Sequence, residues 1–108
     1  MLNQVVLVGR LVKDAELKEL ENGKKVTTIV LAVPRSFKNM NGIYDTDFIE
    51  CILWEHIAQN TTEYCHKGDL LAIKGRLQSK SIEIDEKKMT KLEVVAEKVT
   101  SLSSRTKE

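Results

Sequence analysis

Residues 47–80 have the sequence DFIECILWEHIAQNTTEYCHKGDLLAIKGRLQSK, which predicts a strand, a helix and a second strand. Residues 47–54 are rich in β-branched and aromatic side chains and contain neither Gly nor Pro, as is typical of a strand. Because alternate side chains of a strand share a face, one face carries three predicted core residues, Ile49, Cys51 and Leu53. The opposite face carries two large aromatics around a carboxylate: Phe48, Glu50, Ile52 and Trp54. A face of this composition suits a binding surface.

The pattern becomes helical from Ile57 to Lys67. Apolar residues recur at helical spacing in this segment, which places Tyr64 in the predicted core. Gly68 is expected to end the helix. Lys67 would then lie in the last turn, where a cation suits the helix dipole.

From Leu70 to Lys80 the pattern is again that of a strand. One face is mainly apolar, and the other becomes basic along its length through Lys74, Arg76 and Lys80. A row of one charge sign on a sheet attracts a polyanion, so we expect these residues to contact phosphates. A solvated face with no ligand is the alternative.

The chain has 108 residues, of which 42% are hydrophobic and 31% charged, with a net charge of +1. This length supports one domain with a single core. No segment has the length of a membrane-spanning run or the pattern of a signal peptide, so we expect a cytoplasmic protein with no membrane partner.

The two cysteines, Cys51 and Cys65, are expected to be reduced and buried. Their spacing with His56 and His66 matches no compact zinc pattern. We therefore expect no metal site and no cofactor.

Residues 3–12, NQVVLVGRLV, form an almost continuous apolar strand. A strand that is apolar on both faces needs cover on both sides, which a second subunit can supply in so small a domain. We predict an oligomer interface on this strand, at Asn3, Val5 and Leu7. Gly9 suggests a bulge or a sharp bend.

Residues 14–21 leave two alternatives open. Asp14 could cap a short helix, which residue propensities favour. The Asn22-Gly23 turn and the strand expected over Val26–Val33 favour extended structure instead. Pro34 is expected to end that strand or to lie at its edge, before a polar loop at 35–46 that carries Arg35, Phe37, Lys38 and Tyr44.

The segment Asp85-Glu86-Lys87-Lys88 predicts a hairpin tip before a final strand at Leu92–Val99. Five strands with one helix between the third and fourth are the layout of an all-β OB-fold, a five-stranded Greek-key barrel. We expect this domain to occupy residues 1–102, followed by a short polar end at 103–108.

Four groups of residues lie in an order and spacing that a known family shares. They are Asn3-x-Val5-x-Leu7-Val8-Gly9-x-Leu11, then Asn22-Gly23 with Val26 and Leu31-Ala32, then Glu63-Tyr64 with Lys67-Gly68, then Gly75 with Glu93-Val94. Together they resemble the bacterial single-stranded DNA-binding proteins, over nearly the whole chain.

The resemblance implies an OB-fold homotetramer that wraps single-stranded DNA without strong sequence preference. Bases stack on aromatics at positions that fall here on Phe37, Phe48 and Trp54. Lys and Arg follow the phosphates, and the candidates here are Arg10, Arg35, Lys38, Lys67, Lys74, Arg76 and Lys80. A groove lined with cations and flat rings gives sequence-tolerant binding, in agreement with this division of roles.

Several features depart from the family's pattern. Ile82 falls where a stacking aromatic is common, and Glu50 and His56 fall where cations are common. The family's extension with an acidic tip, which docks replication and repair partners, has no counterpart in residues 101–108. We therefore expect a short form that does not recruit tail-dependent partners.

Two other classes of function are alternatives to DNA binding. Four carboxylates, Asp45, Asp47, Glu50 and Glu55, could hold a metal for phosphodiester cleavage. Neither a nucleophile–base pair nor a phosphate-cradling Gly loop accompanies them, so we expect no enzyme. A protein-docking module of a replication or primosome assembly is the alternative, because a fold alone does not fix a function. We predict single-stranded DNA binding in replication, repair, recombination or DNA uptake.

Overall fold

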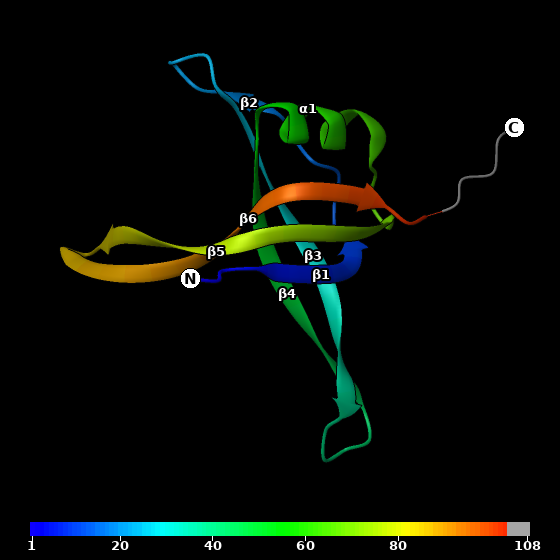
Figure 1. Cartoon of the computed structure of the whole chain (residues 1–108). Helices are drawn as coiled ribbons and strands as arrows, with labels where there is room; N and C mark the ends of the chain where they lie inside the picture. Colours follow the sequence, from blue (N-terminus) through cyan, green and yellow to red (C-terminus); the bar gives the residue numbers. More distant parts are fainter. Residues whose placement is uncertain (104–108) are drawn as a thin grey trace, which may run out of the picture.

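The molecule is a barrel with two projecting hairpins (Figure 1). A computed structural model describes residues 1–103. The elements are β1 (Val5–Leu11), β2 (Lys18–Glu19), β3 (Lys25–Lys38), β4 (Tyr44–Trp54), α1 (Glu55–Tyr64), β5 (Leu70–Ile84) and β6 (Lys87–Ser101). The strands follow the order β1-β5-β6-β4-β3, and β3 pairs back to β1, which closes the barrel. Neighbours run antiparallel except the parallel pair β4–β6. The predicted OB-fold is confirmed.

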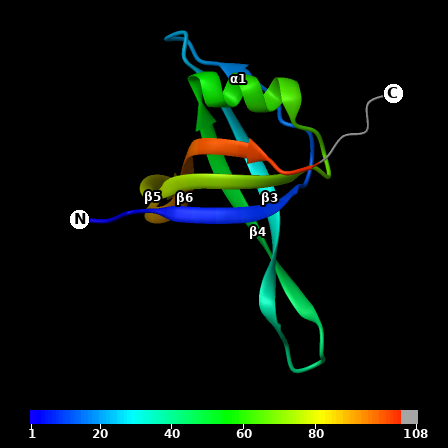
Figure 2. The same cartoon turned by 45° about the vertical axis from the view of Figure 1, so that its right-hand side comes forward.

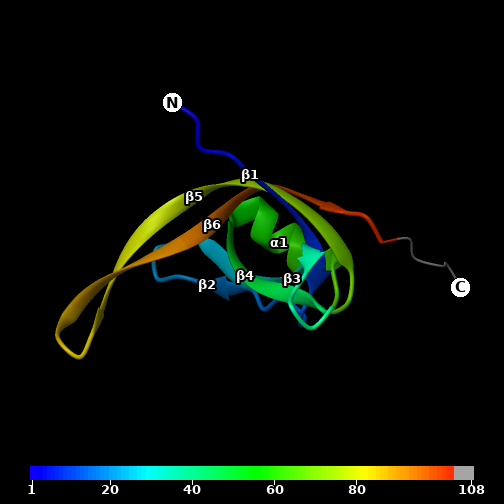
Figure 3. The ribbon, with the colours of Figure 1, turned by 90° about the horizontal axis from the view of Figure 1, so that it is seen from below.

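The helix α1 connects the third and fourth strands of the barrel, β4 and β5, and lies across one end of it (Figures 1 and 3). The short β2 pairs with β3 outside the barrel, so in chain order α1 follows the fourth strand. Residues 14–21 form no helix: Lys18–Glu19 are extended as β2, and the Asn22-Gly23 turn follows. Asp14 accepts a hydrogen bond from the backbone N–H of Lys67, 2.7 Å away, instead of capping a helix.

The helix begins and ends earlier than predicted. The backbone N–H of Cys65 donates to the Thr61 carbonyl at 2.9 Å, and the chain then leaves the helix. Gly68, with φ +89°, forms a turn outside the helix, and its N–H donates to the Leu11 carbonyl at 2.8 Å. Placing Lys67 in the last helical turn was therefore wrong, because the turn around Gly68 ties this loop to β1.

Pro34 does not end its strand, because β3 continues to Lys38; it lies at the sheet edge, the other position predicted for it. The β1–β3 pairs are Arg10–Ala32 and Leu11–Leu31. Beyond them, β3 and β4 leave the barrel as a two-stranded ribbon, which projects below it in Figure 2. A proline is tolerated at such an edge because it removes no bond of a central ladder.

The hairpin tip predicted at residues 85–88 is confirmed for Asp85-Glu86, whereas Lys87 and Lys88 already pair in β6, and both β5 and β6 are longer than expected. The two strands pair as far as Ile84 opposite Lys87, and the tip residues have φ values of +50° and +65°. This hairpin forms a second arm, directed away from the barrel (Figure 3).

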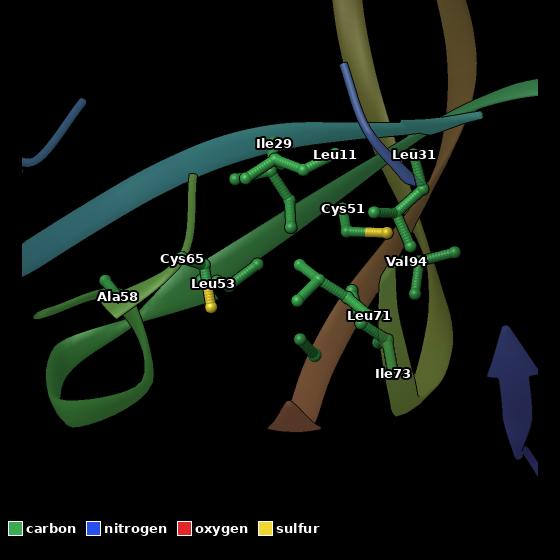
Figure 4. Close-up of a cluster of buried hydrophobic side chains, with 11 residues drawn as sticks. Leu11, Ile29, Leu31, Cys51, Leu53, Ala58, Cys65, Leu71, Ile73 and Val94 are labelled. Atoms are coloured by element: carbon green, nitrogen blue, oxygen red, sulfur yellow. The ribbon is translucent and has the colours of Figure 1, made fainter. Parts of the chain in front are cut away.

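The core contains the residues that alternation predicted on β4. Cys51 and Leu53 are fully buried with five other large side chains: Leu11, Ile29, Leu31, Leu71 and Ile73 (Figure 4). The prediction that Tyr64 is a core residue is wrong, since 69% of it is exposed. The smaller Ala58 and Thr61 are the buried residues of α1.

Close backbone contacts explain two strand glycines. A Cβ at Gly9 would lie 2.6 Å from the Ala32 carbonyl oxygen, so β1 needs glycine where it approaches β3. The β1–β5 register runs unbroken through Gly9, so this residue marks no bulge in that pairing. The register shift lies between Lys74 and Gly75, where a Cβ would lie 2.2 Å from the Val95 carbonyl oxygen.

Candidate nucleic-acid interface

The outer face of β4 presents the mixed aromatic and polar row that alternation predicted. Phe48 is 66% exposed, and Ile52 and Trp54 are half-buried. Trp54 ends β4 immediately before α1 and lies opposite Val26 of β3. The two rings are therefore separated along one strand, with Glu50 and Ile52 between them.

Three hollows meet along this face, and Glu50 lines all of them. The first lies against the segment before β2, and its lining includes Lys13, Lys18, Thr28 and Val30. The second, toward the β5–β6 arm, includes Thr28, Ile52, Lys80, Lys91 and Glu93. The third includes Phe48, Leu77, Leu92, Glu93 and Val94. We call these three hollows together, from Lys13 to Leu92 past Glu50, the β4 groove.

An ion pair lies at the centre of the β4 groove. The Nζ atom of Lys91 is 2.9 Å from Oε1 of Glu50. The hydrogen bond and the charge of Glu50 raise the pKa of Lys91. Lys91 also lies directly opposite Lys80 in the β5–β6 register, and like charges in this position repel each other. Glu50 offsets one of these two charges, which leaves Lys80 as the cation with more freedom to meet a phosphate.

The β3–β4 ribbon carries a second set of rings and charges. Arg35 donates to both carboxylate oxygens of Asp47, at 3.0 and 3.1 Å. The hydrogen bond and the charge of Arg35 lower the pKa of Asp47. The Nζ atom of Lys38 lies 5.7 Å from the centre of the Tyr44 ring, a cation–π distance. Phe37 is 65% exposed on the same ribbon.

The other predicted cations lie around the barrel and not in one row. Arg76 contacts Glu97 at 3.8 Å and donates to Gln78 at 2.9 Å. Lys74 lies in register with Val6 on one side and Lys98 on the other. Arg10 donates to the Gly68 carbonyl at 3.0 Å, near the exposed Lys67. Of the predicted row on β5, Lys80 is the residue that lines the β4 groove.

The residues predicted for an oligomer interface have different environments. The Asn3 side chain exchanges two hydrogen bonds with the backbone of Leu77, at 2.8 and 2.9 Å. Val5 and Leu7 are half-buried and pack against the core. The apolar side chains that β1 leaves exposed are Val6, at 67%, and Val8, at 46%.

The model of the Single-strand binding protein family matches residues 2–102. The chain belongs to this family. It is similar to single-stranded DNA-binding protein B of Bacillus subtilis (strain 168), with 48% identity over 86 residues, which are 80% of this chain and 76% of the relative. It is 44% identical over 106 residues to the single-stranded DNA-binding protein of Bacillus cereus. The aligned residues are 97% of this chain and 62% of the relative. A third relative, single-stranded DNA-binding protein 3 of Streptococcus agalactiae serotype V, is 42% identical over 106 residues.

The chain thus spans less than two thirds of the Bacillus cereus relative and about three quarters of the Bacillus subtilis one. The expectation about a missing acidic tip concerns the end of the chain, and residues 104–108 lie outside the described part.

For this member of the Single-strand binding protein family, reasoning from the sequence missed the groove residues Lys91 and Leu92. A signal for Lys91 was present: counting outward from the Asp85-Glu86 tip places it opposite Lys80. Lys13 and Lys18 were also missed. They precede β3 in a segment without strong periodicity, and the fold brings them to the groove.

Three of the four carboxylates considered for a metal pair with cations: Asp45 and Asp47 with Arg35, and Glu50 with Lys91. Glu55 accepts a hydrogen bond from the backbone N–H of Lys25 at 2.8 Å. Within residues 1–103 no three His, Cys, Asp or Glu side chains are grouped so that they could hold a metal ion. No helix in that part of the chain is long and apolar enough to cross a bilayer. The Single-strand binding protein family is one of non-enzymatic binding proteins, in agreement with the expectation of no enzyme.

Proposed function

We propose that this protein binds single-stranded DNA without strong sequence preference. The observation that carries the proposal is the β4 groove, whose lining includes exposed Phe48, Lys80 and Lys91, with half-buried Trp54 farther along the same face of β4. Stacking on a ring is open to every base, and cations follow the backbone whatever the sequence. The names of the relatives, which describe single-stranded DNA binding, support the same conclusion.

Each group has a distinct role in this proposal. Bases stack on Phe48 in the groove, on Trp54 farther along the same face of β4, and on Phe37 of the β3–β4 ribbon. Lys80 contacts a phosphate directly, whereas Arg35 does so after exchanging Asp47 for the phosphate. Arg10, Lys38, Lys67, Lys74 and Arg76 guide the strand around the rest of the surface. A duplex keeps its bases stacked on one another, so it can use the cations but not the rings.

We also propose a homotetramer, the assembly that the resemblance implies. Exposed Val6 and Val8 support an interface on the outer face of β1. The β1–β3 pairs lie at Arg10 and Leu11, toward the end of β1, so a second copy could approach the edge of residues 5–8. Pairing across a two-fold axis would cover the two valines and this edge together.

The process served is replication, repair, recombination or DNA uptake, in the cytoplasm, where single strands are exposed. The test of DNA binding uses Trp54, the one tryptophan of the chain. We expect an oligo-dT strand to quench its emission strongly, and a duplex of the same length to quench it weakly. Absence of binding at low salt would overturn the proposal and favour the protein-docking alternative.

A further inference from the structure

The carboxylate of Glu50 lies where a strand in the β4 groove would pass, since all three hollows include it. On β4 it lies two residues after Phe48 and four before Trp54, on the same face as both rings. A phosphate is repelled by a carboxylate, so the backbone of a bound strand would follow the lysines. The edge of a stacked base is then the part of the strand that comes to Glu50.

The ion pair with Lys91 leaves one carboxylate oxygen available. Lys91 donates to Oε1 of Glu50 at 2.9 Å. Within residues 1–103, the structure gives Oε2 no hydrogen-bond donor, and half of the Glu50 side chain is exposed. The carboxylate is therefore oriented by one cation and can accept a further hydrogen bond from a ligand.

Bases differ in what they offer to such an acceptor. Cytosine, adenine and guanine carry an exocyclic amino group, and carboxylates accept hydrogen bonds from the amino group of cytosine in DNA complexes. The single ring donor of thymine, N3–H, lies between two carbonyl oxygens that repel a carboxylate. We propose that Glu50 accepts a hydrogen bond from the amino group of a base in the β4 groove and thereby shifts preference away from thymine. This inference rests on the proposed function and adds a specificity-determining residue to it.

The probes are two oligonucleotides of equal length, one of 5-methylcytosine and one of thymine. Both bases carry the same methyl group, and they differ in the amino or carbonyl group at C4 and in the proton on N3. The quantity measured is the ratio of the two dissociation constants, from Trp54 fluorescence at a pH above 7. Loss of negative charge at position 50 strengthens binding to both strands alike, so the ratio isolates the hydrogen bond.

We expect Glu50→Ala to weaken 5-methylcytosine binding relative to thymine by about two- to tenfold, the range of one net hydrogen bond. Glu50→Gln adds a donor that can meet the thymine O4, so it should shift the ratio in the same direction while keeping the shape of the side chain. Glu97→Ala is the matched control. It removes a half-exposed carboxylate that contacts Arg76, and Glu97 is absent from the linings of the three hollows described above.

A ratio that is equal in the native protein and both Glu50 variants would overturn the inference. A ratio that Glu97→Ala shifts as much as Glu50→Ala would overturn it too, because the effect would then be one of general charge. If the native protein bound neither strand, the proposed function itself would fail. Binding of both strands with an invariant ratio would remove only the role of Glu50.

Discussion

Phe48 has the most exposed ring of β4, so its contribution can be tested without removing a core residue. We expect Phe48→Ala to weaken binding of oligo-dT by about 1–3 kcal/mol, the scale for one base stacked on an aromatic side chain. Trp54 remains in this variant and reports binding by fluorescence. Tyr64→Ala is the control, because Tyr64 is equally exposed but lies at the end of α1. Equal losses in the two variants would mean that the ring of Phe48 has no special role.

Cys51 allows a test of the core at the same scale. Burial raises the pKa of its thiol from 9.0 to about 11. The thiolate is the reactive form, so at pH 8 Cys51 should react with an aromatic disulfide reagent only after unfolding. Because the unfolded chain loses this proton at a lower pH, the free energy of unfolding should fall as the pH rises from about 9 to about 11. Rapid labelling of Cys51 in the native protein would contradict the buried position.

Elements differ in how far the sequence could predict them. The β4 strand was predictable because residues 47–54 are rich in β-branched and aromatic side chains without Gly or Pro, and the hairpin tip because residues 85–88 are a charged run before the final strand. The end of α1 was not, because the decisive contact is the bond from Gly68 to Leu11, far away in the chain. The pairing of Lys91 with Glu50 has the same origin, since the parallel contact of β4 with β6 creates it.

The cations of β5 and β6 give a prediction about the salt dependence of DNA affinity, because they have different neighbours. If Lys80 contacts a phosphate, Lys80→Ala should make the slope of log affinity against log salt shallower by about 0.7, the value per contact for single strands. Lys91→Ala should change the slope less, since Glu50 already pairs with this cation. The slope for Lys80→Ala is compared with that for Lys74→Ala, which changes another cation of β5, in register with Val6 and Lys98. If none of the three changes altered the slope, the basic face would be a solvated one.

At the scale of the whole molecule, a net charge of +1 conceals how the charges are placed. Arg35 and Lys91 are each held by a carboxylate in the free protein, Arg35 by Asp47 and Lys91 by Glu50. A surface pair such as Arg35–Asp47 is weak, so a phosphate can replace Asp47 at small cost. Lys91 stays on Glu50 in the proposed complex, so affinity would depend on salt through fewer contacts than the count of Lys and Arg suggests.

The proposed homotetramer gives the last prediction. Charges placed on the outer face of β1 would be buried without partners in an interface, which is strongly unfavourable. We expect the native protein to have about four times the chain mass by light scattering at micromolar concentration, and the double variant Val6→Glu with Val8→Glu to have a smaller mass. Met40→Glu is the control, because Met40 is a fully exposed apolar residue in the turn between β3 and β4. The two glutamates replace exposed side chains, so the variant should keep its fold and its thermal unfolding transition. A native protein that is monomeric in this measurement would refute the assembly, and the exposure of Val6 and Val8 would then need another explanation.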